Sequence, residues 1–207
     1  MMVRNFQRDL DALIEMLGDR RPKLLLHSCC GPCSSYVITY LNDYFDITVL
    51  YFNPSIYPTE EYLHRKAVQL DLIEKINRET EHEVKFIDSD YDHDSFLEIA
   101  KGHETDPECG ERCRECYLQR LTETGRVATE NGFEYFCSTL SVSPHKNAAL
   151  LNEIGEAVAA QVRVSWLPSD FKKKEGYKRS IELSKVYDLY RQDYCGCEFS
   201  KSSRLSE

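Results

Sequence analysis

Short apolar runs alternate with amphipathic helical patterns along most of this chain. We predict strands at residues 23–27, 47–52, 84–87, 135–140 and 162–166. Helical patterns cover residues 6–17, 34–42, 59–78, 95–100, 117–131, 147–160 and 177–190. Strands separated by helices form parallel sheets with right-handed crossovers, and such sheets bind ligands at the carboxyl ends of their strands. The alternation therefore predicts an α/β fold with a parallel sheet, whose functional loops follow the strands.

The length and charge of the chain limit its organisation and its location. With 207 residues, we expect a single α/β domain at residues 22–207 that carries the functional site, preceded by an N-terminal helical extension at residues 1–21. A net charge of −9 excludes a uniformly basic nucleic-acid binder but allows a local basic patch. No apolar run approaches the roughly 20 residues that cross a bilayer. Charges also interrupt the apolar pattern of the first residues, so we expect a cytoplasmic protein with no secretory signal and no membrane partner.

The nine cysteines are too few for a disulfide-stapled scaffold, and most of them are clustered. In a reducing compartment, clustered cysteines more often bind metal or perform redox chemistry. Cys29, Cys30 and Cys33 lie between the first predicted strand and the next helix. The start of a helix favours the thiolate form of a nearby cysteine. This segment is therefore expected to hold reactive or metal-binding thiols.

Two further cysteine pairs extend this pattern. Cys113 and Cys116 form a C-x-x-C motif at the start of a predicted helix, a spacing that chelates zinc and iron–sulfur clusters. Together with the first cluster, this pair supplies the four thiolates that a closed metal site needs. Cys195 and Cys197 flank Gly196, and a disulfide across one residue is easily reduced. Two single cysteines remain, and we expect a loop position for Cys109 and a core position for Cys137.

Alternative interpretations stay open at this stage. Cys30-Gly31-Pro32-Cys33 matches the dithiol of thioredoxin-like thiol–disulfide oxidoreductases, but no Trp precedes it and the other clusters are left unexplained. A zinc-stabilised module that binds tRNA would also use several thiols. The three cysteines near residue 30 would alternatively be small residues packed at a tight turn, and the last pair two unrelated thiols.

Six segments together resemble the epoxyqueuosine reductases of the cobalamin-independent, iron–sulfur type, the QueH family. The matching segments are HSCCGPCS at 27–34, YFNPSIYP at 51–58 with EY at 61–62, CRECY at 113–117 with RL at 120–121, STL at 138–140, SPHK at 143–146 and YRQDYCGC at 190–197. They run from about residue 22 to residue 200. The resemblance implies a Rossmann-like parallel sheet of the adenine-nucleotide α-hydrolase (HUP) type with a helical C-terminal part. The cysteine loop takes the place of the phosphate loop of that group, so ATP pyrophosphatase chemistry is not expected.

The resemblance also implies a reaction, cofactors and partners. A 4Fe–4S cluster would be held by Cys29, Cys30, Cys113 and Cys116, and Cys195 and Cys197 would be the redox-active pair. A second, mononuclear metal would lie near Cys33, Cys195 and Cys197. The implied reaction reduces the epoxide of epoxyqueuosine, in the anticodon loop of tRNA, to the alkene of queuosine, the last step of queuosine biosynthesis. An external one-electron donor would supply the electrons.

Other residues are candidates for substrate binding and proton transfer. Residues 172–179 contain five basic side chains, which favours a local contact with tRNA phosphates, although a solvated helix start would look the same. Tyrosines suited to stacking on an extruded base are Tyr57, Tyr62, Tyr177 and Tyr194. Candidate proton donors are His27, Asp193 and Tyr194, each of which is more often structural.

Overall fold

The computed structural model describes residues 4–204, and its centre is a five-stranded sheet in which all paired strands are parallel. The strands are β1 (Lys23–His27), β2 (Asp46–Tyr51), β3 (Lys85–Asp88), β4 (Tyr135–Ser138) and β5 (Ser165–Trp166). Their order is β3-β2-β1-β4-β5, which is typical of Rossmann-like folds. The predicted fold class is therefore confirmed.

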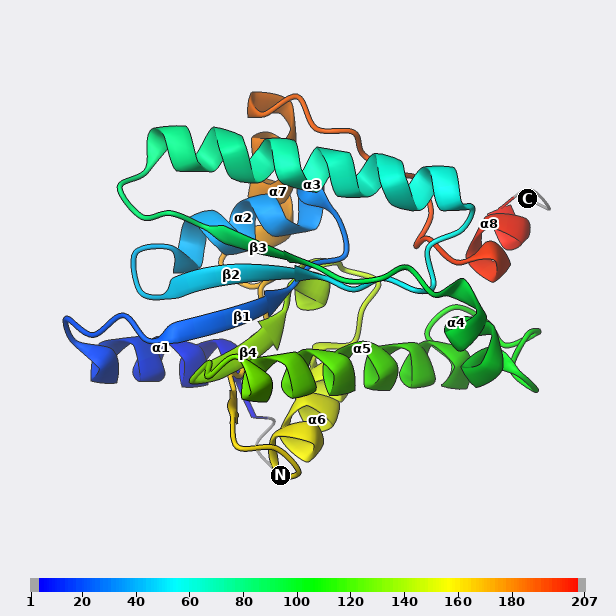
Figure 1. Cartoon of the computed structure of the whole chain (residues 1–207), viewed down its shortest axis with the longest axis horizontal. Coiled ribbons are helices and arrows are strands. Elements are labelled where there is room, and N and C mark those ends of the chain that lie inside the picture. The colour runs from blue at the N-terminus through cyan, green and yellow to red at the C-terminus, as the bar shows by residue number, and fades with distance from the viewer. Residues whose placement is uncertain (1–3, 205–207) are drawn as a thin grey trace.

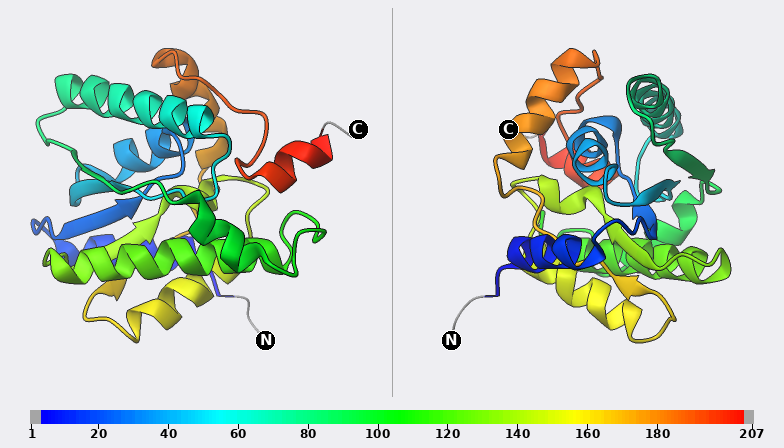
Figure 2. Two further views of the ribbon diagram at one scale, coloured as in Figure 1. Left: turned by 45° about the vertical axis from the view of Figure 1, so that its right-hand side comes forward. Right: turned by 90° about the vertical axis from the view of Figure 1, so that its left-hand side faces the viewer.

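Helices cover both faces of the sheet. They are α1 (Phe6–Leu17), α2 (Gly31–Leu41), α3 (Thr59–Glu79), α4 (His93–Ala100), α5 (Glu111–Glu130), α6 (Ala148–Ala159), α7 (Gly176–Val186) and α8 (Glu198–Arg204), with a 3-10 helix η1 (Thr139–Val142). Figures 1 and 2 show α2, α3 and α7 on one face and α1, α5 and α6 on the other. The short helices α4 and α8 lie together beyond the end of the sheet (Figure 1).

Apolar strands explain why the sheet is enclosed in this way. Leu24, Leu25 and Leu26 of β1 are fully buried, as expected for a central parallel strand that is covered on both faces. Leu10 and Leu17 of α1 belong to the same core cluster, so α1 packs on the domain that follows it. None of the helices within residues 4–204 is long and apolar enough to cross a membrane.

Several element boundaries differ from the sequence prediction, for local reasons. β4 stops at Ser138, because its hydroxyl accepts a hydrogen bond from the Leu140 N–H and starts η1. α7 ends at Val186 rather than residue 190, because Asp188 adopts a left-handed φ of 50° and the next residue donates back to the Ser184 carbonyl. α5 begins at Glu111, earlier than predicted, and α8 was not predicted.

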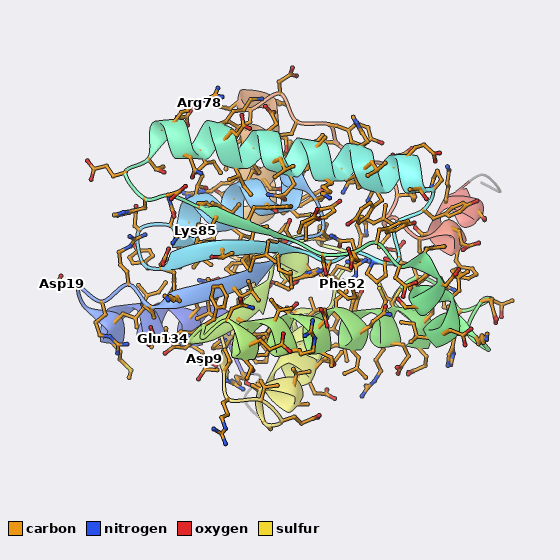
Figure 3. The ribbon with its side chains drawn as sticks, in the orientation of Figure 1. Asp9, Asp19, Phe52, Arg78, Lys85 and Glu134 are labelled. Carbon is orange, nitrogen blue, oxygen red and sulfur yellow. The ribbon has the colours of Figure 1, made fainter. Side chains whose placement is uncertain are left out.

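The carboxyl ends of the strands and the loops that follow them lie together at one end of the sheet. Figure 3 marks this end by Phe52, directly after β2, and the opposite end by Lys85 at the start of β3. The turn from β1 into α2 and the turn from β4 into η1 both open there. This is the edge at which Rossmann-like sheets bind their ligands.

Candidate metal and redox site

Three cysteines lie close together in the turn between β1 and α2. The Sγ atoms of Cys29, Cys30 and Cys33 are all within 4.8 Å of one another, and within residues 4–204 they form the one group of three or more candidate metal ligands at this spacing. Cys29 Sγ is 3.7 Å from Cys30 Sγ. Cys30 is the N-cap of α2, so the thiols lie at the positive end of that helix. The sequence prediction that this turn concentrates thiols is confirmed.

A buried polar network holds this turn in place. The Ser28 and Ser34 hydroxyls donate to Gln69 Oε1 over 2.6 and 2.7 Å, and all three side chains are fully buried. The Asn53 amide donates to the Ser28 carbonyl over 2.8 Å. These hydrogen bonds tie the turn that carries the thiols to Gln69 of α3 and to Asn53 after β2.

Hydrogen bonds also shift the pKa values of the three thiols in opposite directions. The thiols of Cys29 and Cys33, together with the Gln192 amide at 3.0 Å, hydrogen bond to Cys30 Sγ and hold the pKa of Cys30 well below its usual range. The pKa values of Cys29 and Cys33 are raised, mainly because these two thiols act as the donors. Cys30 is only 1% exposed, which does not suit the attacking thiol of a thioredoxin-like oxidoreductase.

The second cysteine pair lies beside the first cluster, across two adjoining cavities. A small cavity is lined by four sulfurs, those of Cys113, Cys116, Cys195 and Cys197. A larger cavity, about 350 Å³, is lined by Cys29, Cys33 and Cys195, among others. Four residues line both cavities, namely Arg120, Leu140, Lys146 and Cys195. The fold thus brings all seven clustered cysteines to one end of the sheet, but it arranges them as two neighbouring groups.

The loop that carries Cys195 and Cys197 is fixed to the start of α3. The Gly196 carbonyl accepts from the Tyr57 N–H over 2.8 Å, and the Tyr194 hydroxyl donates to the Tyr57 carbonyl over 2.7 Å. Arg65 Nη1 donates to the Cys195 carbonyl over 3.2 Å. Gly196 has a φ of +134°, so this backbone path favours glycine. The loop therefore has a defined shape although Cys195 is exposed.

Buried cations surround the sulfurs, whereas no carboxylate is buried within the described residues. The buried cations are Arg65, Arg112, Arg120 and Lys146. Lys146 Nζ lies 3.1 Å from Cys195 Sγ and 2.9 Å from Glu108 Oε1. Buried positive charge requires a negative partner. The lining therefore suits thiolates and the anionic metal centres that thiolates form.

The three candidate proton donors are in different situations. His27 is fully buried, and burial together with the nearby Arg120 lowers its pKa to about 4, so its ring is neutral at pH 7. Its Nε2 lies 3.0 Å from the Phe52 carbonyl and must donate, while Nδ1 faces the Ser138 hydroxyl at 2.9 Å. The one proton of the neutral ring is therefore already committed to the hydrogen bond with the Phe52 carbonyl, which does not suit a proton donor. Asp193 and Tyr194 instead line the larger cavity.

The structure corrects part of the prediction about the tyrosines and basic residues that would bind tRNA. Tyr62 is 2% exposed and donates its hydroxyl to the Ser89 carbonyl, so the expectation that it stacks on a base is wrong. Tyr177 and Tyr194 line the larger cavity, and Tyr57 is partly exposed beside it. Among the basic residues at 172–179, three pair with carboxylates, namely Lys172 with Asp170, Lys174 with Asp11 and Lys178 with Glu175. Lys173 and Arg179 form no ion pair within the described part of the chain, so the free charge is smaller than the sequence suggests.

Two single cysteines lie where the sequence predicted, and several site residues were not recognised. Cys137 is fully buried in the core, and Cys109 lies in an exposed loop, where its N–H donates to Cys113 Sγ over 3.3 Å. The roles of Arg65, Arg120 and Lys146 were missed, because each looks like an ordinary surface charge in its segment. Only their burial beside the sulfurs distinguishes them.

Comparisons with known proteins agree with this site. Residues 24–203 match a family model described as epoxyqueuosine reductase QueH. A relative from Staphylococcus epidermidis with this name is 46% identical over 182 residues, which cover 87% of this chain and 76% of the relative. The similarity extends to relatives of the same name from Streptococcus pyogenes, 43% identical over 87% of this chain and 71% of the relative, and Acinetobacter baylyi, 40% identical over 89% and 83%.

Proposed function

Because the chain belongs to the epoxyqueuosine reductase QueH family, we propose that it reduces the epoxide of epoxyqueuosine in tRNA to the alkene of queuosine. In this reaction both C–O bonds of the epoxide break, a C=C bond forms, and the oxygen leaves as water. The change consumes two electrons and two protons. The observation that carries the proposal is the set of six cysteines that line two adjoining cavities with cationic walls, with Cys30 buried next to Cys29.

A 4Fe–4S cluster is the cofactor that these residues suit best. Thiolates are its usual protein ligands, and the buried cations with unpartnered atoms, such as Arg65 Nη2 and Arg120 Nε, match a group that carries negative charge. We assign the cluster to Cys29, Cys30, Cys113 and Cys116. When bound, such a cluster transfers electrons one at a time. Cys33 competes for this assignment, because it lies with Cys29 and Cys30.

The remaining thiols are suited to a different task. Cys195 and Cys197 can release an electron pair by forming a disulfide, which would couple a one-electron donor to the two-electron reduction. The Lys146 ammonium lies 3.1 Å from Cys195 Sγ, so a positive charge faces this sulfur. Cys33 lines the same cavity as Cys195, so a second metal held by Cys33, Cys195 and Cys197 is part of the proposal. The enzyme would act in the cytoplasm, where its tRNA substrate is found.

Iron and sulfide analysis after anaerobic purification tests the cofactor. Cys113→Ala should remove most of the iron and the broad visible absorption, while Cys33→Ala should keep the cluster. Cys137→Ala is the matched control, because this thiol is buried in the core and its pKa is raised by burial alone, with no contribution from another cysteine. If Cys113→Ala keeps its iron and Cys33→Ala loses it, the ligand set must be redrawn around the β1–α2 turn. A protein that binds only zinc would favour the tRNA-binding module instead.

Serine substitutions test the redox pair. Each single change at Cys195 or Cys197 should leave the cluster spectrum intact and abolish the formation of queuosine in tRNA under reducing, anaerobic conditions. The double variant should be no worse than either single variant, because the two sulfurs act as a unit. Near-normal turnover of both single variants would exclude the redox role, and loss of the cluster would make one of the pair a ligand.

A further inference from the structure

We propose that Arg120 is the electrostatic countercharge of the thiolate-bound cluster and that it makes the cluster easier to reduce. This inference rests on the proposed function, since it requires an iron–sulfur cluster at the cysteine site. Arg120 acts here through its charge, as a positioning and tuning residue, and not by touching the substrate.

The location of Arg120 places its charge between the two groups of sulfurs. It follows Cys116 by four residues on α5, so the two side chains share one face of the helix. The residue is 4% exposed, and it lines both the small and the larger cavity. One cavity contains Cys113 and Cys116, and the other contains Cys29. Arg120 therefore faces thiols from both groups, as does Lys146, but Lys146 already pairs with the Glu108 carboxylate.

Arg120 has no anionic partner among the described residues and, unlike the other buried cations near the site, makes a single side-chain hydrogen bond. Arg65 Nε pairs with Glu61 at 2.6 Å, and Lys146 pairs with Glu108. Arg112 donates to the carbonyls of residues 103, 104 and 106 over 2.8 to 3.0 Å. Arg120 donates only to the neutral hydroxyl of Ser55, and its Nε has no hydrogen-bond partner. A fully buried charge in this state is destabilising until an anion lies beside it.

A cluster held by four thiolates supplies that anion, and its negative charge grows by one when it accepts an electron. A fixed positive charge in a region of low dielectric constant stabilises the more negative, reduced state. Net charge and hydrogen bonding around the sulfurs are among the factors that set the potentials of such clusters. Arg120 should therefore raise the reduction potential, which eases electron delivery from an outside donor.

Anaerobic redox titration of the loaded full-length protein tests this inference. At the midpoint potential of the wild type, Arg120→Met should reduce the ratio of reduced to oxidised cluster by at least about tenfold, which corresponds to about 59 mV for one electron. Arg120→Lys keeps the charge, and Ser55→Ala keeps the arginine but removes its hydrogen bond, so both should stay close to the wild type. An unchanged midpoint in Arg120→Met, or an equal fall in Ser55→Ala, would overturn the proposal.

Thermal melting of the metal-free and loaded forms gives a second readout that does not depend on activity. Without the cluster, Arg120→Met removes an unpaired buried charge and should melt at the same temperature as the wild type or higher. With the cluster, it removes the countercharge and should melt lower. A merely structural arginine would lower both, as we expect for Arg112→Met, because its guanidinium holds the carbonyls of residues 103, 104 and 106. Lower melting of both forms of Arg120→Met would refute the inference, whereas a wild type that takes up no iron would refute the cluster assignment itself.

Discussion

Replacing Gly196 by alanine tests whether the shape of the 194–197 loop controls the chemistry. An added Cβ would lie 3.1 Å from Arg65 Nη1 and 3.2 Å from Ile56 Cγ1, at a φ of +134°. Backbone strain of this kind costs roughly 1–3 kcal/mol. A displaced loop would also weaken the hydrogen bonds of the Gly196 and Cys195 carbonyls, each worth about 0.5–1.5 kcal/mol. We therefore expect the free energy of unfolding to fall by roughly 2–6 kcal/mol.

Turnover should fall as well, because a displacement of about 1 Å at a reacting group can reduce a rate by about a hundredfold. Gly132→Ala is the matched control, since Gly132 also has a positive φ, +67°, but a Cβ there would meet nothing within 4 Å. This control should lose about 1–2 kcal/mol and keep its turnover. Urea denaturation and chromatography of tRNA nucleosides measure the two quantities. If Gly196→Ala and Gly132→Ala behave alike in both assays, the loop geometry does not control the reaction.

Three further predictions concern the tRNA surface, the core and the pH dependence. Replacing Lys173 and Arg179 by Gln should weaken tRNA binding and reduce the slope of log K against log salt concentration by up to about one per cation removed. Lys174→Gln should have a smaller effect, because Lys174 already pairs with Asp11. Equal effects of the two changes in a filter-binding salt series would contradict this. Asn152→Leu should lower the free energy of unfolding by roughly 2–5 kcal/mol in urea denaturation. The buried amide accepts from Trp166 Nε1 at 2.9 Å and from the Ser169 N–H at 3.0 Å, and it donates to the Ser169 carbonyl at 2.8 Å. A loss below about 1 kcal/mol would show that water replaces these hydrogen bonds. Partial burial raises the pKa of Asp11, but hydrogen bonds from Lys174 and two other side chains outweigh this effect and keep the pKa below its ordinary value of 3.8. The ionised Asp11 therefore stabilises the fold above that pH, and this contribution disappears as the pH falls through the lowered pKa. Asp11→Asn should therefore lower the melting temperature at pH 7, and a difference from the wild type that persists unchanged at pH 2 would refute this.

The sequence predicted the main features of the fold because they depend on local patterns. The apolar residues Leu24, Leu25 and Leu26 favour a buried strand, and the alternation of such strands with helical patterns leaves few arrangements other than a parallel sheet. Boundaries failed where a side chain or a turn intervened. Ser138 ends β4 through a hydrogen bond two residues along the chain, and Asp188 ends α7 by a left-handed turn. A single hydrogen bond or a left-handed turn leaves no trace in the spacing of apolar residues, so the pattern could not reveal these boundaries.

The chemistry of the site was also present in the sequence, because clustered thiols have few other uses in such a chain. The sequence by itself determined that seven of the nine cysteines are clustered and that the first cluster follows a strand. Only the tertiary structure decided how they are grouped, with Cys33 beside Cys29 and Cys30, and Cys113 across an adjoining cavity. It alone also decided that Arg120 and Lys146 are buried beside them. The physical reason is that spacing along the chain fixes the neighbours within one turn of helix, whereas burial and charge pairing depend on contacts between α5, the β1–α2 turn and the C-terminal loop, which lie far apart in sequence.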